Sequence, residues 1–293
     1  MNGDPKSDKQ EPKGQPTSEQ IIRALEKSGY LFENKIARMA ESLGYHVESN
    51  WAFEDPDEST SREVDIRAFR RIESENKFLQ VNIEMLIECK NSDSPIVFLK
   101  TPKNKRELDY PQPIEYIFPV KKYRRRIAPT LSQEVGGFTR FALSKSHYYY
   151  REGNKHTQFA KIVRKSSDWH ANHDGIYDSL IIPQVKAIEN RLAEVNKHLP
   201  FRDRTTVWLF FNVIVLRDHL FSVDLSGTAL EPTPEGRVSF VRHIRSRTLD
   251  GYYLTDFVTE GYFANFAQEV QSFADSILEI GVTQLTTQEY SEN

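Results

Sequence analysis

Hydrophobic residues recur along this chain with two different periods, and these periods predict its secondary structure. Apolar residues return every three to four positions over residues 31–43, 176–199 and 262–280, which predicts three amphipathic helices. A shorter helix is expected after Thr17, whose hydroxyl is a typical N-terminal cap, and Gly29 would end it.

Alternation of apolar and polar residues predicts the strands. Residues 62–72 and 79–90 alternate in this way, and the polar stretch 74–77 between them predicts an antiparallel hairpin. Looser alternation or unbroken apolar runs predict further strands at residues 45–53, 205–216, 220–225 and 238–244.

The middle and the two ends of the chain have a different character. Residues 101–172 show no clear period, so we expect short elements inserted into a larger domain. Residues 1–17 are polar and predict a disordered tail, and residues 286–293 predict a loose one. The sequence thus predicts one α/β domain over residues 18–285. It would have a mixed sheet flanked by helices, a long insertion at about 101–172 and a C-terminal strand–helix extension.

Composition narrows the class of protein. Hydrophobic residues make up 38% of the 293 residues and charged residues 28%, which is typical of a globular protein. No run approaches the roughly 18 apolar residues of a membrane span, and the N-terminus lacks the apolar stretch of a signal peptide. The single cysteine, Cys89, excludes an intrachain disulfide and fits a reducing cytoplasm. Because the net charge is -3, any DNA binding is expected to depend on local basic patches or on metal ions.

The predicted hairpin brings two carboxylates together. Opposed residues of an antiparallel pair have numbers with a constant sum, and Asp65 with Glu88 gives 153, which centres the turn between Asn76 and Lys77. The two side chains would then lie within roughly 5 Å of each other at Cβ. Lys90, two residues after Glu88, would project from the same face of the sheet.

A divalent cation would relieve the repulsion between these two carboxylates. Oxygen ligands suit Mg²⁺, which polarises a phosphoryl oxygen and lowers the pKa of its water, and a nearby lysine can orient that water. The alternative is a surface hairpin with an ordinary cross-strand ion pair. The sequence around Glu88 favours the metal site, because charges are rarely placed in a strongly apolar strand without a partner or a metal.

Three parts of the chain resemble the PD-(D/E)XK nuclease superfamily. They are Glu33 followed by Leu-Gly-Tyr-His-Val at 43–47, Glu-Val-Asp-Ile at 63–66, and Ile-Glu-Cys-Lys at 87–90. Within the superfamily, they are most similar to the branch of Mrr-type restriction endonucleases and archaeal Holliday-junction resolvases. The resemblance implies a restriction-endonuclease-like fold whose core order is helix, three strands, helix and strand.

The resemblance also implies roles for individual residues. Asp65 and Glu88 would hold Mg²⁺, or Mn²⁺ as a substitute, together with the main-chain carbonyl of Cys89. Lys90 would be the catalytic lysine, and Glu33 would sit at the metal from the first core helix. The chain departs from the superfamily pattern in two places: Val64 stands where a proline often precedes Asp65, and about 80 residues separate the lysine strand from the next core helix.

Several basic clusters are candidates for contact with nucleic acid. For the densest one, contact with phosphates and a solvated surface are equally good interpretations. It comprises Lys121, Lys122, Arg124, Arg125 and Arg126. Two smaller clusters are Arg67 with Arg70 and Arg71, where a solvated face is favoured over contact with substrate, and Lys161 with Arg164 and Lys165. For the three tyrosines at 148–150, core packing or a homodimer contact is favoured over stacking on bases.

These observations lead to one expected function and two alternatives. The expected function is a Mg²⁺-dependent endonuclease that hydrolyses DNA, in restriction of foreign DNA or in DNA repair. The first alternative is a module that keeps the fold and binds nucleic acid without cutting it. The second is an assembly subunit of a larger defence complex, in which the insertion makes protein contacts.

Overall fold

The computed structural model describes residues 14–112, 114, 123–128, 131–173, 175–197 and 205–289. The helices are α1 (Ser18–Ser28), α2 (Tyr30–Ser42), α3 (Lys105–Asp109), α4 (Gly137–Arg140), α5 (Leu143–Ser146), α6 (Tyr148–Arg151), α7 (Ile176–Lys197), the 3-10 helix η2 (Glu260–Tyr262) and α8 (Phe263–Glu289). The strands are β1 (His46–Glu54), β2 (Ser61–Glu73), β3 (Leu79–Lys90), β4 (Ile96–Pro102), β5 (Tyr123–Ala128), β6 (Leu131–Val135), β7 (Asn154–Lys165), β8 (Asp168–Asn172), β9 (Thr205–Leu216), β10 (Leu220–Asp224), β11 (Pro232–Pro234), β12 (Arg237–Arg245) and β13 (Asp250–Thr259).

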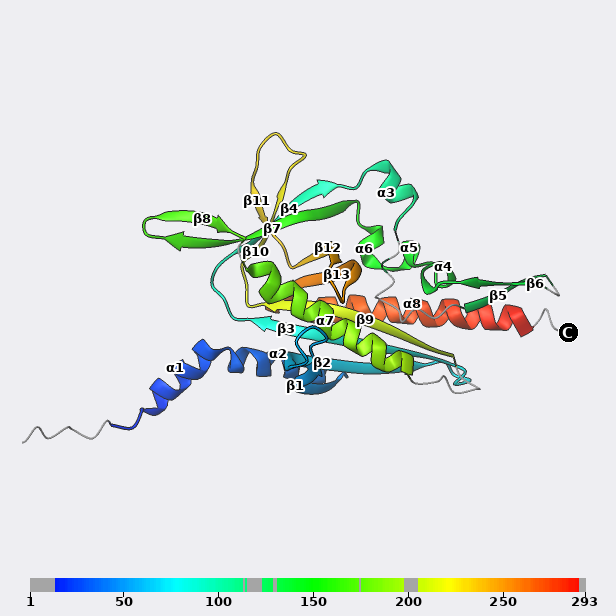
Figure 1. Ribbon diagram of the computed structural model, residues 1–293, viewed down its shortest axis with the longest axis horizontal. Helices are drawn as coiled ribbons and strands as arrows, with labels where there is room; N and C mark the ends of the chain where they lie inside the picture. The colour runs from blue at the N-terminus through cyan, green and yellow to red at the C-terminus, as the bar shows by residue number, and fades with distance from the viewer. Residues whose placement is uncertain are drawn as a thin grey trace, which may run out of the picture.

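A mixed sheet flanked by helices forms the body of the protein (Figure 1). In the described part of the chain it has eleven strands, in the order β1-β2-β3-β9-β13-β12-β7-β4-β10-β11, and β8 pairs with β7. Strand β2 runs antiparallel to both of its neighbours, β1 and β3, whereas β9 runs parallel to both β3 and β13. The expected α/β class with a mixed, helix-flanked sheet is therefore confirmed.

The hairpin of β2 and β3 has the register that the sequence predicts. Its pairs run from Glu73 opposite Gln80 to Ile66 opposite Ile87, and each pair sums to 153. The polar turn closes the hairpin through a hydrogen bond from the Ser74 N–H to the Leu79 carbonyl, at 2.9 Å. Because one slipped residue would turn every side chain to the opposite face, this register decides which residues can meet Asp65.

Strand β3 is buried on both faces, which explains its nearly continuous apolar sequence. Its odd-numbered residues pack against α2 and α8, in the same cluster as Ile36 and Phe266. On the other face, Leu86 packs with Ile188 and Leu192 of α7. The even-numbered Glu84, Glu88 and Lys90 therefore point to the α7 side of the sheet.

Three expectations about elements were incomplete. Helix α8 was expected to end near residue 280 but runs to Glu289, so a loose tail beginning at 286 is wrong. Strand β13 was not anticipated, because Asp256 interrupts its apolar pattern. The region at 101–172 does not stand apart from the body, since β4 and β7 extend the main sheet.

Both ends of the chain are described only in part. Most of the predicted N-terminal tail, residues 1–13, and residues 290–293 lie outside the described residues. Among the helices that are described, none combines the length and the apolarity needed to cross a membrane.

Candidate functional site

Asp65 lies where the two hairpin strands part. The last main-chain pair between β2 and β3 joins Ile66 and Ile87, and beyond it the Cys89 N–H donates to Asp65 Oδ2 at 2.7 Å. The carboxylate therefore takes the place of a main-chain acceptor in the gap between the strands. This contact fixes Asp65 at the end of β3 that carries Glu88 and Lys90.

Glu88 and Lys90 are in direct contact. Lys90 Nζ lies 2.5 Å from Glu88 Oε1, and the two side chains are 34% and 17% exposed. Both groups can therefore be reached from solvent, although their strand is otherwise buried. The predicted convergence of the lysine with one carboxylate is observed.

Glu33 approaches the same place from the first turn of α2. Gly29, with φ +91°, ends α1 and begins α2 in a left-handed conformation that favours glycine. A Cβ at this position would lie 3.3 Å from Glu33 Oε1, so glycine also leaves room for the carboxylate. Burial and the nearby charge of Glu88 raise the pKa of Glu33, whereas Lys90 lowers it.

Crowding of these acids is clearest at Asp65. Burial, followed by the charge of Glu88, raises the pKa of Asp65 to about 7, and Glu33 adds to the shift. The Cys89 N–H and Lys90 act in the opposite direction but are weaker. At neutral pH the site therefore lacks enough positive charge for its carboxylates, which is the condition that a bound cation relieves.

Cys89 contributes its main chain and not its thiol. The side chain is buried in the cluster against α2 and α8, and burial raises the pKa of the thiol. In a β-strand, the N–H and C=O of one residue point to the same side. Because the Cys89 N–H points to Asp65, its carbonyl is directed to the same gap between the strands.

The donor set fits Mg²⁺ with a small number of protein ligands. Among the described residues, no three Asp, Glu, His or Cys side chains lie close enough together to share a metal ion. Mg²⁺ commonly binds one or two carboxylates and keeps several waters. Asp65, Glu88 and the Cys89 carbonyl suit that requirement. Glu33 would add negative charge near the ion without being a ligand.

Gln184 of α7 is a member of the site that the sequence reading missed. Its Nε2 lies 3.5 Å from Glu88 Oε2, and the residue is only 1% exposed. Its Oε1 is buried and has no hydrogen-bond partner in the described part of the chain, which leaves an acceptor free for a water of a hydrated ion. A signal was present: Gln184 lies three residues after buried Ile181, on the apolar phase of the helix.

A buried ion network holds α7 against β3 beside the site. Glu84 is 0% exposed and accepts from Arg67 Nε at 2.8 Å and from Arg191 Nε at 2.6 Å. Burial alone would raise the pKa of Glu84, but the two arginines hold it below its usual value. The sequence favoured a solvated face for Arg67, and this is wrong. The side chain faces α7 and is paired with buried Glu84.

The residues after Lys90 connect the site to α1 and β9. Asn91 donates to the Glu26 carbonyl of α1 at 2.7 Å and accepts from Arg217 Nη1 at 3.3 Å. The main-chain N–H of Arg217 also lies 3.4 Å from the Lys90 carbonyl. An exposed arginine that sequence patterns did not single out thus lies beside the end of β3.

Two further predictions concern the densest basic cluster and the three tyrosines. Lys121 and Lys122 lie outside the described residues, as do the side chains of Arg124, Arg125 and Arg126 on β5. Tyr148 packs against the core, and its hydroxyl donates to Asp256 Oδ2 at 2.5 Å, as core packing predicts.

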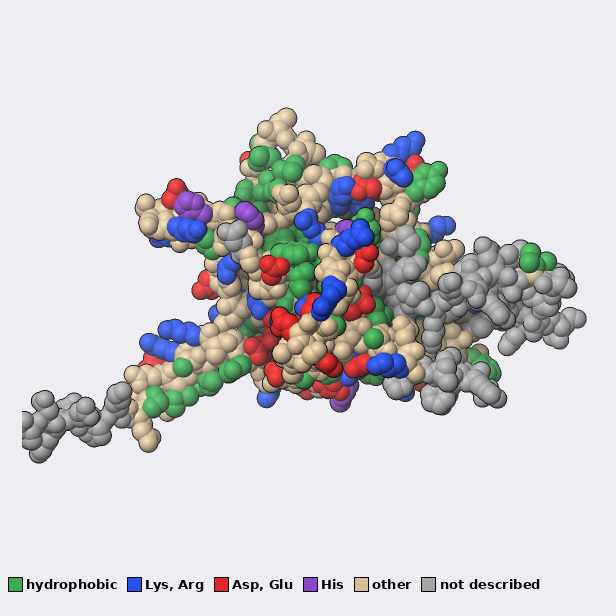
Figure 2. All heavy atoms as spheres, in the orientation of Figure 1, with side chains coloured by type: hydrophobic (Ala, Val, Ile, Leu, Met, Phe, Trp, Pro, Cys, Tyr) green, Lys and Arg blue, Asp and Glu red, His purple; other side chains and the backbone are tan. Residues whose placement is uncertain are grey.

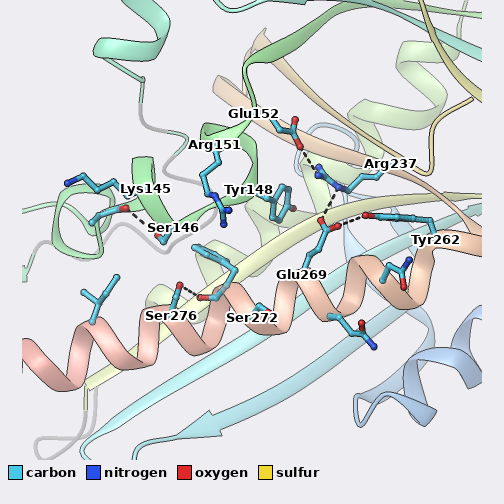
Figure 3. A pocket seen from close by; sticks show the side chains of 15 residues that line it. Lys145, Ser146, Tyr148, Arg151, Glu152, Arg237, Tyr262, Glu269, Ser272 and Ser276 are labelled. Atoms are coloured by element: carbon cyan, nitrogen blue, oxygen red, sulfur yellow. Dashed lines mark hydrogen bonds and ion pairs between the residues drawn. The ribbon is translucent and has the colours of Figure 1, made fainter. Parts of the chain in front are cut away.

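A cavity of about 980 Å³ lies beside Tyr148 and α8 (Figure 3), and Asp65, Glu88 and Glu33 are not among its lining residues. Arg237 on its wall is paired with Glu152 at 2.6 Å and with Glu269 at 3.1 Å. Because this cation already has acidic partners, the cavity gives no clear preference for an anionic ligand. Its described lining contains no residue of β2 or β3, so it does not compete with the carboxylates as the candidate site.

Replacing Gln184 by leucine is expected to weaken the binding of a divalent cation roughly 10- to 100-fold, because an outer group that orients a ligand is lost. The change keeps the size of the side chain, so the midpoint of thermal unfolding should stay close to that of the wild type. The matched control is Gln80→Leu, the same change at a buried position at the far end of β3. Equal affinity of the two variants for Mg²⁺ would remove Gln184 from the site.

Comparisons with known proteins identify no relative. No family model matches the chain, and no curated protein and no solved structure matches it significantly. The candidate site is therefore defined by its geometry alone. Its residues are Asp65, Glu88, Lys90, Glu33 and Gln184.

Proposed function

We propose that this protein is a Mg²⁺-dependent endonuclease that hydrolyses phosphodiester bonds of DNA. The observation that carries the proposal is that Asp65 accepts from the Cys89 N–H where β2 and β3 separate, one residue from the ion-paired Glu88 and Lys90, and that Asp65 lies close enough to Glu88 to feel its charge. The raised pKa of Asp65 supports it, because a strained group of acids in an otherwise apolar sheet suggests a function. A restriction-endonuclease-like core, in the order α2, β1, β2, β3, α7 and β9, is part of the same proposal.

Each residue has a defined task in this account. Asp65 and Glu88 would hold Mg²⁺, and the Cys89 carbonyl would be the third protein ligand. A bound Mg²⁺ would supply Lewis acidity toward a phosphoryl oxygen and toward water. Lys90 orients the attacking water and balances the negative charge that develops on the phosphate. Gln184 holds Glu88 in place, and Glu33 increases the negative potential that attracts the cation.

Incubation with plasmid, linear and branched DNA tests the proposal. Wild type should cut with Mg²⁺ or Mn²⁺ and should be inactive with EDTA, and Lys90→Ala should lose roughly 10²- to 10⁴-fold in rate. Lys105→Ala, an exposed lysine on α3, is the control for loss of one positive charge. Cleavage that persists in EDTA or in Lys90→Ala would contradict the mechanism. Binding without cleavage would favour the silent module, and neither activity would favour the assembly subunit.

The pKa of Asp65 predicts a pH dependence of metal binding. With a folded-state pKa of about 7, Asp65 is mostly protonated at pH 6 and mostly ionised at pH 8. Affinity for Mg²⁺ should therefore rise about tenfold over this interval, because the ligand must lose its proton. Calorimetric titrations at the two pH values measure it. In Glu88→Gln the pKa of Asp65 falls, so the residual affinity should depend less on pH, and an equal dependence would count against this coupling.

A further inference from the structure

We propose that residues 161–172 form a DNA-binding ribbon that enters a groove of duplex DNA. This segment comprises the last part of β7, the turn and the whole of β8. The proposal rests on the proposed function and deepens it, because it assigns double-stranded DNA as the substrate class. Residues 161–172 are called the ribbon below.

The ribbon extends beyond the sheet. Its strands pair from Lys161 opposite Asn172 to Lys165 opposite Asp168, and the pairing of β7 with β4 stops at Lys161. Residues 164–171 are all exposed. Two strands without a buried face are only marginally stable in water, so burial of a core does not account for this extension. Figure 1 shows it projecting from the same end of the molecule as α1 and the end of β3.

Its composition suits a polyanion. The ribbon carries Lys161, Arg164 and Lys165 against one acid, Asp168, which gives +2 (three minus one), whereas the whole chain is at -3. Arg164 lies opposite Trp169, which is 62% exposed, so a cation and a large apolar ring share one face. Lys161 and Lys165 alternate onto the other face. Cations on both faces suit a groove, because a phosphate backbone lies on each side of it.

Its base lies close to the catalytic strand. The Ile162 N–H donates to the Pro95 carbonyl at 2.8 Å, and Pro95 is five residues after Lys90. Five residues span at most about 17 Å, and the ribbon reaches roughly 10 Å further to its turn. Both lengths together are shorter than one turn of B-DNA, at about 34 Å. A duplex whose phosphate lies at Lys90 is therefore within reach of the ribbon. Exposed Arg217, which donates to Asn91, is a further cation near Lys90.

The geometry favours B-form DNA over other nucleic acids. A two-stranded ribbon fits the major groove of B-DNA, whereas the major groove of duplex RNA is too narrow for side chains to enter. Helix α1, with exposed Arg23 and Lys27, projects on the other side of the site. Figure 2 shows Lys and Arg side chains on both projections and a hollow outline between them.

Binding measured in a Lys90→Ala background tests the ribbon separately from cleavage. The variant Arg164→Ala/Lys165→Ala should bind a 30-base-pair DNA duplex at least roughly tenfold more weakly. The slope of log affinity against log salt should fall by about 1 for each lost phosphate contact. The matched control, Lys105→Ala/Arg106→Ala, removes two adjacent exposed cations from α3 and should bind normally. Arg164→Lys/Lys165→Arg should restore the salt slope, which separates lost contacts from misfolding.

The outcomes distinguish this inference from the proposed function. If the ribbon variant binds DNA as the control does, or if duplex RNA binds equally well through the same residues, the ribbon proposal is overturned even when the wild type cuts DNA. If the ribbon variant loses duplex binding but the wild type never cuts, the ribbon proposal stands and the nuclease proposal fails.

Discussion

Asp65→Asn is expected to abolish cleavage while making the protein more stable above neutral pH. Loss of an ion ligand removes several kcal/mol of transition-state stabilisation, or roughly a 10³-fold decrease in rate. The stability gain follows from the folded-state pKa of about 7, which is raised above the ordinary value of 3.8. The cost of the buried charge is absent near pH 4, grows as the pH rises and is complete above pH 7. Asparagine avoids this cost and can still accept the Cys89 hydrogen bond.

Thermal or urea unfolding in EDTA at pH 4 and pH 8 measures the effect. At pH 8 the variant should exceed the wild type by on the order of 1–3 kcal/mol, because water reaches the site and reduces the full penalty. At pH 4 the difference should disappear. Asp93→Asn, at an exposed position near Lys90, is the control and should change stability by less than about 0.5 kcal/mol. A variant that is less stable than the wild type at pH 8 would show that Asp65 is not strained.

Glu84→Gln is expected to cause the largest loss of stability. The change leaves two guanidinium groups, Arg67 and Arg191, buried together without their shared carboxylate. Removal of one partner from a buried ion pair costs about 3–5 kcal/mol. Arg191 and Gln184 lie on the same helix, and Glu84 and Glu88 on the same strand face. Loosening of α7 should therefore also weaken the Gln184 contact and slow cleavage.

Glu194→Gln provides the matched control for this prediction. Glu194 is the more exposed partner of Arg191, so its loss should cost less than about 1 kcal/mol. Urea unfolding of both variants gives the comparison. If both lie within 1 kcal/mol of the wild type, the Glu84 network does not hold α7 on the sheet.

The hairpin could be predicted from the sequence because its information is local. A polar turn, two alternating strands and a constant sum of positions predicted the register of the hairpin. The observed pairs keep this sum, although the main-chain pairing ends at Ile66 and Ile87, one position before Asp65 and Glu88. Strand β9 was also found, since its apolar run is nearly unbroken, and β1 was found from a looser alternation.

The rest depends on contacts between distant parts of the chain. Gln184 meets Glu88 across 96 positions, and Arg191 meets Glu84 across 107, so no local pattern reports either pair. Arg67 occupies a polar position of its strand, which a period of two assigns to solvent, although α7 covers that face. Strands β4 and β7 belong to the main sheet only because they pair with each other and with β10 and β12. Periodicity alone therefore could not separate an insertion from the core.

Titration of the metal-free protein with Mn²⁺, followed by the electron paramagnetic resonance signal of the free ion, tests the central claim most directly. The wild type should bind Mn²⁺ saturably, and Mg²⁺ should compete for it. Asp65→Asn and Glu88→Gln should each weaken this binding at least tenfold, whereas Lys90→Ala and Asp93→Asn should keep it. Unchanged binding in either carboxylate variant would contradict the claim that these two side chains hold one ion.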